Sequence, residues 1–234
     1  MRKPTRERFK TFGDVFDAFT IRNLFVLASK GIFEEDTLSP ISIGKESNVF
    51  SASGPKGKVV VKIHRLETRD FNRMQFYIKS DPRFIGMRGQ GRKVVFAWAR
   101  REYSNLMIAK EVGVRASLPI AFLHNIIVME HIGKDAPAPM LKDAYPRNPK
   151  SFYNEIMKNV KKFYKAGYVH GDLSAFNILN LGEKPVFIDL SHSTPSQNPI
   201  FNELLSRDVR IINAFFQKHG LKLSYEEALR KVKG

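Results

Sequence analysis

Apolar residues in the first part of the chain recur at the spacing of an amphipathic helix. Within residues 11–30, phenylalanine, valine, leucine and alanine return about every third or fourth position, and Gly31 follows as a helix stop. Strand-length apolar runs then occupy residues 41–53 and 58–64, joined by the turn segment 53–57, which contains glycine and proline. We therefore predict one or two helices followed by two paired strands.

The same pattern predicts a long helix over residues 95–112, after a glycine-bearing stretch at residues 65–93 whose tail we expect to be a mobile basic loop. A short hairpin at residues 120–129 and a connector at residues 130–139, which contains proline and glycine, come next. Three further helical patterns lie beyond the connector: residues 149–166, 199–219 and 225–233. This order predicts an α+β fold with a mixed N-terminal part and a mainly helical C-terminal part.

Composition adds one strong feature, an excess of positive charge. The 234 residues include 39 Lys+Arg against 23 Asp+Glu, a formal net charge of +16. Such a field attracts polyanions, so RNA or a ribonucleoprotein is an expected partner; solubility, or adaptation to a salty or hot cytoplasm, is the plainer interpretation. Two groups of cations are candidate RNA contacts: Arg83, Arg88, Arg92 and Lys93 in the expected loop, and Lys218, Lys222, Arg230, Lys231 and Lys233 near the end.

Cysteine usage and hydropathy exclude several classes of protein. The chain has no cysteine, which excludes disulfides, zinc–thiolate sites and cysteine nucleophiles and is consistent with a reducing cytosol. A signal-peptide pattern is not found, and the apolar runs are far shorter than the roughly 20 residues that span a bilayer. A cytoplasmic protein is expected.

The strongest chemical signal is the segment 170–177, which reads H-G-D-L-S-A-F-N and fits the kinase pattern H-x-D-x-x-x-x-N. Phosphoryl transfer needs a carboxylate that orients the acceptor hydroxyl and takes its proton, and Asp172 is placed for that role. Asn177 supplies an oxygen ligand for Mg²⁺, and Asp189 follows the apolar run 186–188, where a carboxylate can bridge metal and phosphates. A lone aspartate is more often a turn or cap residue, but this spaced trio favours a phosphotransfer site.

A second segment, V-V-V-K, ends at Lys62 and matches the strand lysine that holds the α- and β-phosphates in kinases. Strand-end lysines commonly extend to solvent, so this match alone is weak. If the ammonium is half buried it needs a partner, and Glu102 on the following helix is preferred over Glu111 near that helix's far end. Upstream, the glycine-rich kinase loop is missing, and residues 41–50 read I-S-I-G-K-E-S-N-V-F instead.

Taken together, these motifs resemble the RIO family of atypical protein kinases, and within it the first (Rio-one) subfamily. Residues 42–50 resemble the family's S-x-G-K-E-[AS]-[ND]-V-[YF] loop, residues 170–177 its H-G-D-L-S-x-x-N, and residues 188–193 its I-D-[VL]-S-[QH]-S. Residues 133–139 and the leading segment 15–32 point to the subfamily. The resemblance covers roughly residues 12–219.

The resemblance implies a reduced two-lobed protein-kinase-like fold. Its expected parts are an N-terminal helical extension at residues 1–40, an N-lobe at 41–132 with a mobile insert near 80–94, and a C-lobe at 133–234. Gly171 stands where most kinases have arginine, and no A-P-E segment follows Asp189. We therefore expect no activation-loop or peptide-docking subdomains.

The resemblance also implies roles for individual residues. Met129 is the expected gatekeeper, and backbone groups of Glu130 and Ile132 are expected to meet the adenine of ATP. The phosphate contacts that follow from the family loop and strand are Ser42, Lys45, Ser47, Val49 and Lys62. Asn177 and Asp189 are expected to hold Mg²⁺, with Mn²⁺ as a substitute, and Asp189 to accept phosphate transiently. The implied role is a kinase and ATPase in maturation of the small ribosomal subunit.

The sequence is also compatible with two other functions. Small-molecule phosphotransferases of the aminoglycoside or choline kinase kind share the H-G-D-L-x-x-x-N loop. They commonly place a second histidine where this chain has Ser174, and an acidic residue where Leu190 and Ser191 stand. A non-catalytic RNA-binding scaffold would explain the positive charge, but not the intact set of Lys62 and the three site residues.

Overall fold

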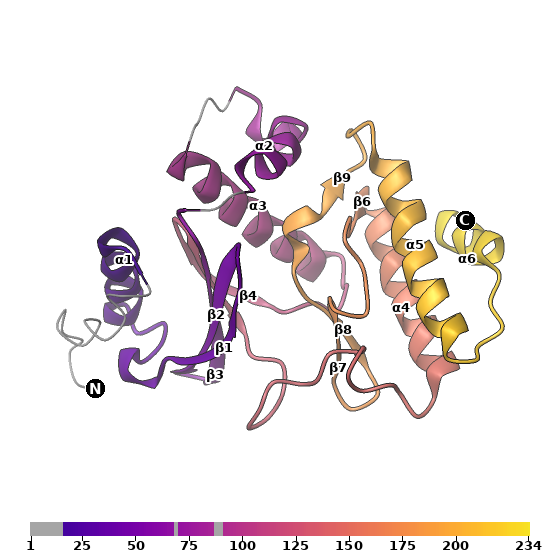
Figure 1. Cartoon of the computed structure of the whole chain (residues 1–234), viewed down its shortest axis with the longest axis horizontal. Coiled ribbons are helices and arrows are strands. Elements are labelled where there is room, and N and C mark those ends of the chain that lie inside the picture. The colour runs from indigo at the N-terminus through magenta and orange to yellow at the C-terminus, as the bar shows by residue number, and fades with distance from the viewer. Residues whose placement is uncertain (1–15, 68–69, 87–90) are drawn as a thin grey trace. The chain divides into compact units, whose positions relative to one another are not determined.

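The computed structural model describes residues 16–67, 70–86 and 91–234 (Figure 1). They divide into two compact units. The first takes its residues from Met1–Ile78, Met87–Tyr103 and Leu118–His131, and the second from Lys79–Gly86, Ser104–Ser117 and Ile132–Gly234. Among the described residues, no helix has the length and apolar character needed to span a bilayer.

The first unit is built on a five-stranded antiparallel sheet in the order β1-β2-β3-β5-β4. Its strands are β1 (Ser39–Ile43), β2 (Ser47–Gly54), β3 (Gly57–His64), β4 (Pro119–Leu123) and β5 (Ile126–Glu130). The single strand predicted over residues 41–53 is wrong, because the chain reverses after Ile43 and forms the β1–β2 hairpin. Gly44 permits this turn: its N–H donates to Ser47 O at 3.0 Å, and a Cβ on it would lie 2.9 Å from that oxygen.

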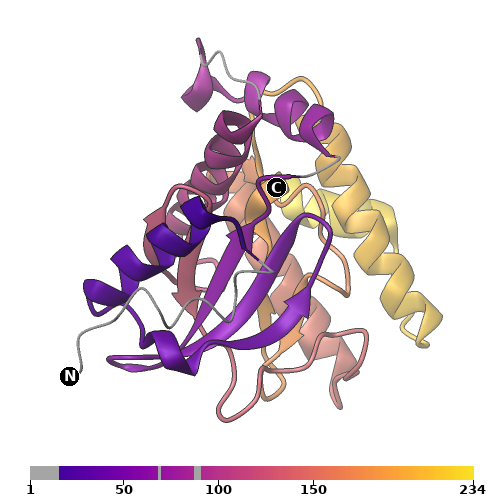
Figure 2. The ribbon, with the colours of Figure 1, turned by 60° about the vertical axis from the view of Figure 1, so that its left-hand side comes forward.

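Helix α1 (Ala18–Ser29) covers one face of this sheet, as Figure 2 shows, and the short helix η2 (Glu35–Thr37) follows it. Asp17 begins α1, since its carboxylate accepts from the N–H groups of Phe19 and Thr20. The helix buries Leu24 and Leu27 against alternate residues of the strands, whose period of two turns every second side chain to the same face. Helix α1 and this face of the sheet thereby form a hydrophobic core.

The described part of the stretch between β3 and β4 contains more helix than the sequence indicates. It contains α2 (Phe71–Lys79), η3 (Pro82–Phe84) and the long helix α3 (Arg92–Glu111). Neither α2 nor η3 is predicted by the sequence pattern. Arg92 and Lys93 lie in α3 rather than in a basic loop, and Arg88 lies outside the described residues. The last turns of α3, from Ser104, belong to the second unit.

The second unit is mainly helical, as predicted. Its elements are α4 (Pro149–Lys165), β6 (Tyr168–Val169), β7 (Ile178–Asn180), β8 (Pro185–Phe187), η4 (Leu190–His192), β9 (Thr194–Pro195), α5 (Phe201–Lys218) and α6 (Tyr225–Lys233). Helices α4 and α5 pack through buried aromatic side chains such as Tyr153 and Phe216, whose ring centroids are 5.5 Å apart, and α6 buries Ala228 and Val232. Only residues 190–200 separate Asp189 from α5, so the segment that carries an activation loop in larger kinases is absent here.

Candidate active site

The β7–β8 hairpin places two of the three predicted site residues at one of its ends. Asn177 comes directly before β7, and Asp189 comes two residues after β8. Ile178 pairs with Phe187, and the N–H of Ile188 donates to Asn177 O at 3.0 Å. The predicted strand–turn–strand is therefore present, and it brings the backbone of Asn177 next to the residue that precedes Asp189.

Asn177 also joins Asp172 to this group. Its Nδ2 atom donates to Asp172 O at 2.7 Å and to Asp172 Oδ2 at 3.2 Å. Because the donor end of the amide is directed at Asp172, the oxygen end is the one that can serve a cation. Amide and carboxylate oxygens suit Mg²⁺, which keeps several ligand positions for water and phosphate. The residues therefore fit Mg²⁺ bound together with a nucleotide.

Asp189 has an unusual backbone conformation. Its φ of 57° and ψ of 68° lie in the left-handed region, which costs a non-glycine residue roughly 1–2 kcal/mol. Such conformations persist where the surrounding structure imposes them, and they concentrate at functional sites. The hydroxyl of Ser191 donates to Asp189 Oδ1 at 2.7 Å, which orients the carboxylate.

The segment 170–177, the candidate catalytic loop, is held by Asp208 on α5, a residue that the sequence shows only as part of a helix. Its carboxylate accepts from the N–H groups of Gly171 at 2.8 Å and Leu173 at 3.0 Å, on either side of Asp172. Arg207 donates to Gly171 O. Burial raises the pKa of Asp208 to about 7, partly opposed by the two backbone hydrogen bonds and the charge of Arg207. No local sequence pattern predicts that Asp208 supports this segment, because more than thirty residues separate it from Gly171 and Leu173.

Gly171 explains one departure from the common kinase loop. It has a φ of +78°, and a Cβ at this position would lie 2.5 Å from His192 O. An arginine would therefore be strained in its backbone and would collide with the chain after Asp189. The neighbouring His170 is buried, and burial lowers its pKa although the charges of Asp189 and Asp172 oppose this. Its Nε2 lies 3.2 Å from Ile188 O, so a neutral ring protonated at Nε2 can hold that carbonyl.

In the first unit, Lys62 pairs with Glu102 rather than Glu111. Lys62 Nζ lies 2.7 Å from Glu102 Oε1, and the two side chains are 10% and 1% exposed. Glu102 Oε2 lies 3.0 Å from Nε2 of the buried His64, although the two atoms do not meet hydrogen-bond geometry. A nitrogen of a basic side chain therefore lies near each carboxylate oxygen of Glu102. The contact with His64 was not predicted, since a histidine two residues after the strand lysine carries no known signature.

The predicted phosphate contacts lie on neighbouring strands. Ser42 of β1 pairs with Val49 of β2, and Val49 pairs with Lys62 of β3. Directly paired residues point to the same face of a sheet, so these three form one row. Lys45 is exposed in the turn between β1 and β2, and Ser47 begins β2.

The predicted adenine contacts divide between the two units. Met129 and Glu130 end β5 in the first unit, and Ile132 begins the connector in the second. The N–H of Glu130 donates to Leu118 O, and Ile132 O accepts from the N–H of Ala138. The contacts of Glu130 and Ile132 with adenine stay a prediction.

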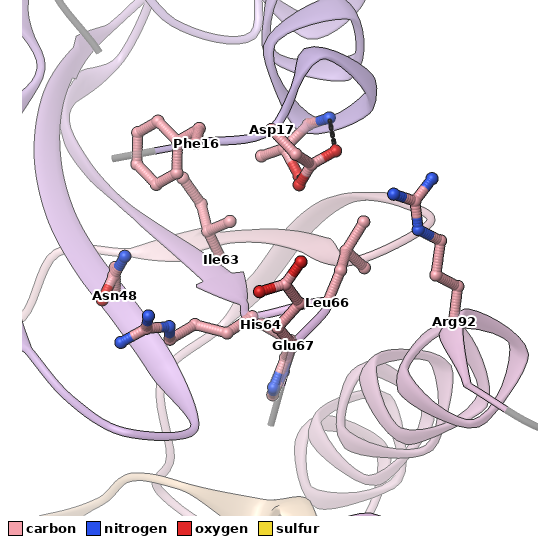
Figure 3. Close-up of a pocket in the computed structure, with 10 residues that line it drawn as sticks. Phe16, Asp17, Asn48, Ile63, His64, Leu66, Glu67 and Arg92 are labelled. Carbon is pink, nitrogen blue, oxygen red and sulfur yellow. Dashed lines mark hydrogen bonds between the residues drawn. The ribbon is translucent and has the colours of Figure 1, made fainter. Parts of the chain in front are cut away.

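A separate pocket of about 320 Å³ lies in the first unit, beside α1 and the end of β3 (Figure 3). Asn48, His64, Glu67 and Arg92 are among the polar residues that line it. The predicted nucleotide contacts do not line this pocket. It adjoins the Lys62–Glu102 pair through His64, whose Nε2 lies 3.0 Å from Glu102 Oε2.

Fold and site together define a protein-kinase-like, ATP-dependent phosphotransferase. A family model described as the RIO domain matches residues 48–229, and the chain belongs to the RIO family. The RIO-type serine/threonine-protein kinase Rio1 of Haloferax volcanii is 37% identical over 222 residues, which cover 94% of this chain and 76% of that protein. The Rio1 kinase of Methanocaldococcus jannaschii is 36% identical over 231 residues, covering 97% and 79%.

The similarity extends to longer proteins and to solved structures. The human serine/threonine-protein kinase RIO1 is 33% identical over 90% of this chain, which corresponds to 38% of the human protein. A crystal structure of the Rio2 kinase–ADP/Mg²⁺–phosphoaspartate complex from Chaetomium thermophilum superimposes with a TM-score of 0.68 at 24% identity. That match covers 90% of this chain and 65% of the Rio2 chain, and it supports the kinase-like fold.

Proposed function

We propose that this chain is a RIO-type serine/threonine kinase and ATPase that uses Mg²⁺-ATP and phosphorylates itself. The observation that carries the proposal is the hydrogen bonding of Asn177 to Asp172, at the end of the hairpin that leads to Asp189. Asp172 orients an acceptor hydroxyl and takes its proton, while Lys62, held by Glu102, contacts the phosphates. Asn177 and Asp189 hold Mg²⁺, which when bound neutralises charge on the phosphate oxygens.

We also propose that Asp189 carries phosphate transiently. A carboxylate oxygen attacks the γ-phosphorus of ATP, the bond from that phosphorus to the β,γ-bridging oxygen breaks, and ADP leaves with the electron pair. Water then hydrolyses the acyl phosphate, which releases inorganic phosphate and restores the carboxylate. The phosphoaspartate in the crystal structure of the Rio2 kinase supports this step. The short segment between Asp189 and α5 also supports it, because this segment leaves little structure for docking a peptide.

The proposed partner is an RNA-containing particle, the maturing small ribosomal subunit. Of the cations considered above, Arg83 is engaged internally with Asp81 and Asn105 and contributes little to an RNA surface. Lys158 and Lys161 of α4, together with Arg230 and Lys231 of α6, line a surface hollow of about 490 Å³ in the second unit. This α4–α6 basic surface is the favoured RNA contact, because phosphate backbones are bound by clustered lysine and arginine.

The test of the chemistry measures ADP formation and autophosphorylation by the full chain with Mg²⁺-ATP. Removing a general base typically costs about 10²- to 10⁴-fold in rate, so we expect that loss in Asp172→Ala. Asp143→Ala is the matched control, because Asp143 is an exposed aspartate of the same unit. Full turnover in Asp172→Ala would show that the assignment of the base is wrong.

The aspartyl-phosphate is tested by the stability of the phosphate label. Acyl phosphates are cleaved by hydroxylamine, whereas phosphoserine and phosphothreonine are not. We expect a hydroxylamine-sensitive label in the wild type that Asp189→Asn lacks; a label that is entirely resistant in the wild type contradicts the step. ATP consumption that depends on added choline or an aminoglycoside would instead support a small-molecule phosphotransferase.

A further inference from the structure

The turn that follows Asp189 is held by a single buried side chain from α3. Asn105 is fully buried, and its Nδ2 atom donates to Leu190 O at 2.7 Å and to Ser193 O at 3.1 Å. These two carbonyls belong to the residues that begin and follow η4, the short helix directly after Asp189. One amide group therefore spans the turn that begins at the strained aspartate.

The orientation of this amide is fixed from its other end. Arg83 donates from Nη2 to Asn105 Oδ1 at 2.8 Å. Arg83 is in turn held by Asp81, with Nε to Oδ1 at 2.9 Å and Nη2 to Oδ2 at 2.6 Å. Since arginine only donates, it requires the oxygen of Asn105 on its side and so directs both amide hydrogens toward the turn.

This network is anchored in the fold rather than on a mobile surface. Asp81 is 1% exposed, and its carboxylate also caps η3 by accepting from the N–H of Arg83. Asn105, Arg83 and Asp81 all lie in the second unit, as does the turn they hold. The chain Asp81–Arg83–Asn105 thus reaches from η3 to the backbone beside Asp189.

We infer that Asn105, oriented by Arg83 and Asp81, is a positioning residue for the Asp189 carboxylate. A left-handed aspartate can relax into an ordinary conformation if the following turn is released, and its carboxylate would then point elsewhere. A buried asparagine with satisfied hydrogen bonds is often merely structural. Here both N–H groups of the Asn105 amide donate to backbone carbonyls in the turn that follows Asp189, the proposed metal ligand. This placement favours a role in orienting that ligand.

The inference rests on the proposed function, in which Asp189 holds Mg²⁺. Its test measures how ATP turnover depends on Mg²⁺ concentration and, by calorimetry without turnover, how Mg²⁺ binds in the presence of ADP. Residues that orient a metal ligand typically change metal affinity or activity by about 10- to 100-fold when they are removed. We expect Asn105→Ala to raise the Mg²⁺ concentration for half-maximal turnover by about 10-fold or more. Excess Mg²⁺ should restore most of the rate in this variant but not in Asp189→Asn.

Arg83→Met provides a second variant for the case in which Asn105→Ala does not fold. Arg83 is partly exposed, and its removal releases the orientation of the Asn105 amide but keeps its Nδ2 donor, so we expect a smaller increase in the same direction. Arg100→Met, at an exposed position of α3, is the control and should leave the Mg²⁺ dependence unchanged. Thermal unfolding of each variant identifies any loss of folded protein.

The outcomes separate the two hypotheses. If the wild type turns over ATP, Asp189→Asn does not, and each of the variants Asn105→Ala and Arg83→Met that folds keeps the wild-type Mg²⁺ dependence, the positioning role is wrong. A loss of stability with proportional loss of rate at every Mg²⁺ concentration would also overturn it. If Asp189→Asn retains full turnover, the proposed function of Asp189 itself fails.

Discussion

At the scale of single residues, the buried ion pair of Lys62 and Glu102 has a measurable consequence for stability. Removing one partner of a buried pair leaves an uncompensated charge, which typically costs about 3–5 kcal/mol. We expect Glu102→Ala to lower the free energy of unfolding by that amount in urea titrations, because Lys62 and His64 both lose their neighbour. Glu111→Ala on the same helix is exposed and should change it by no more than about 0.5 kcal/mol.

An equal loss in the two variants would contradict the structural role of Glu102. It would mean that the ammonium of Lys62 finds water or another partner when the carboxylate is removed. The comparison needs no ATP, so it is independent of any activity measurement.

Asp208 gives the stability a pH dependence that can be assigned to one group. Its pKa is about 7 in the folded protein against an ordinary value of 3.8, so the folded state takes up the proton more readily than the unfolded state. This contribution is present in full below about pH 4 and is lost as the pH rises to about 7. At about 1.4 kcal/mol per pKa unit, the loss is at most about 4 kcal/mol.

We therefore expect the stability of the wild type relative to Asp208→Asn to fall between pH 4.5 and pH 7.5, measured by urea unfolding. The asparagine does not titrate, so the difference between the two proteins isolates this carboxyl group. Asp143→Asn, at an exposed aspartate, should show no such trend. A constant difference between wild type and Asp208→Asn across this range would show that the pKa is not raised.

At the scale of elements, α1 depends on its first hydrogen-bonded turn. The Asp17 carboxylate accepts from two backbone N–H groups and from the hydroxyl of Thr20 at 2.8 Å. Losing such a cap typically costs about 1 kcal/mol, whereas asparagine caps nearly as well as aspartate. We expect Asp17→Ala to lower the unfolding free energy by about 1 kcal/mol and Asp17→Asn by much less, and equal effects would contradict the capping role.

The elements also show what the sequence could and could not predict. The candidate catalytic loop and the β7–β8 hairpin could be predicted from local patterns, because Asp172, Asn177 and Asp189 lie close together in the sequence. The β1–β2 hairpin was missed because a single glycine, Gly44, reverses a run that otherwise has the length of one strand. Helix α2 was missed because it has only nine residues, although its buried residues Met74, Tyr77 and Ile78 recur at helical spacing.

Contacts across long sequence separations were beyond any local pattern. Asp208 supports the catalytic loop from a position 35 to 37 residues away, and Asn105 reaches carbonyls 85 and 88 residues away. The partners of these buried polar residues are visible only in the three-dimensional structure. The pairing of Lys62 with Glu102 over 40 residues was predicted because the resemblance to kinases supplied it.

At the scale of the whole molecule, the net charge of +16 predicts binding to RNA that weakens with salt. For single strands, the logarithm of the binding constant falls with the logarithm of salt by about 0.7 per phosphate contact. Replacing the four cations of the α4–α6 basic surface by glutamine should therefore reduce that slope by about 3, if each contacts one phosphate. Fluorescence anisotropy of a labelled RNA over a range of salt concentrations measures it.

The control separates a local surface from a general field. A second variant replaces four exposed cations elsewhere with glutamine: Arg22, Lys30, Lys56 and Lys134. Both variants lose four charges, so the long-range attraction of the molecule falls equally, and only direct phosphate contacts can distinguish them. A larger loss of slope in the α4–α6 variant supports a defined RNA surface there. Equal slopes in the two variants would mean that RNA is attracted by the total charge, and the α4–α6 assignment would then be wrong.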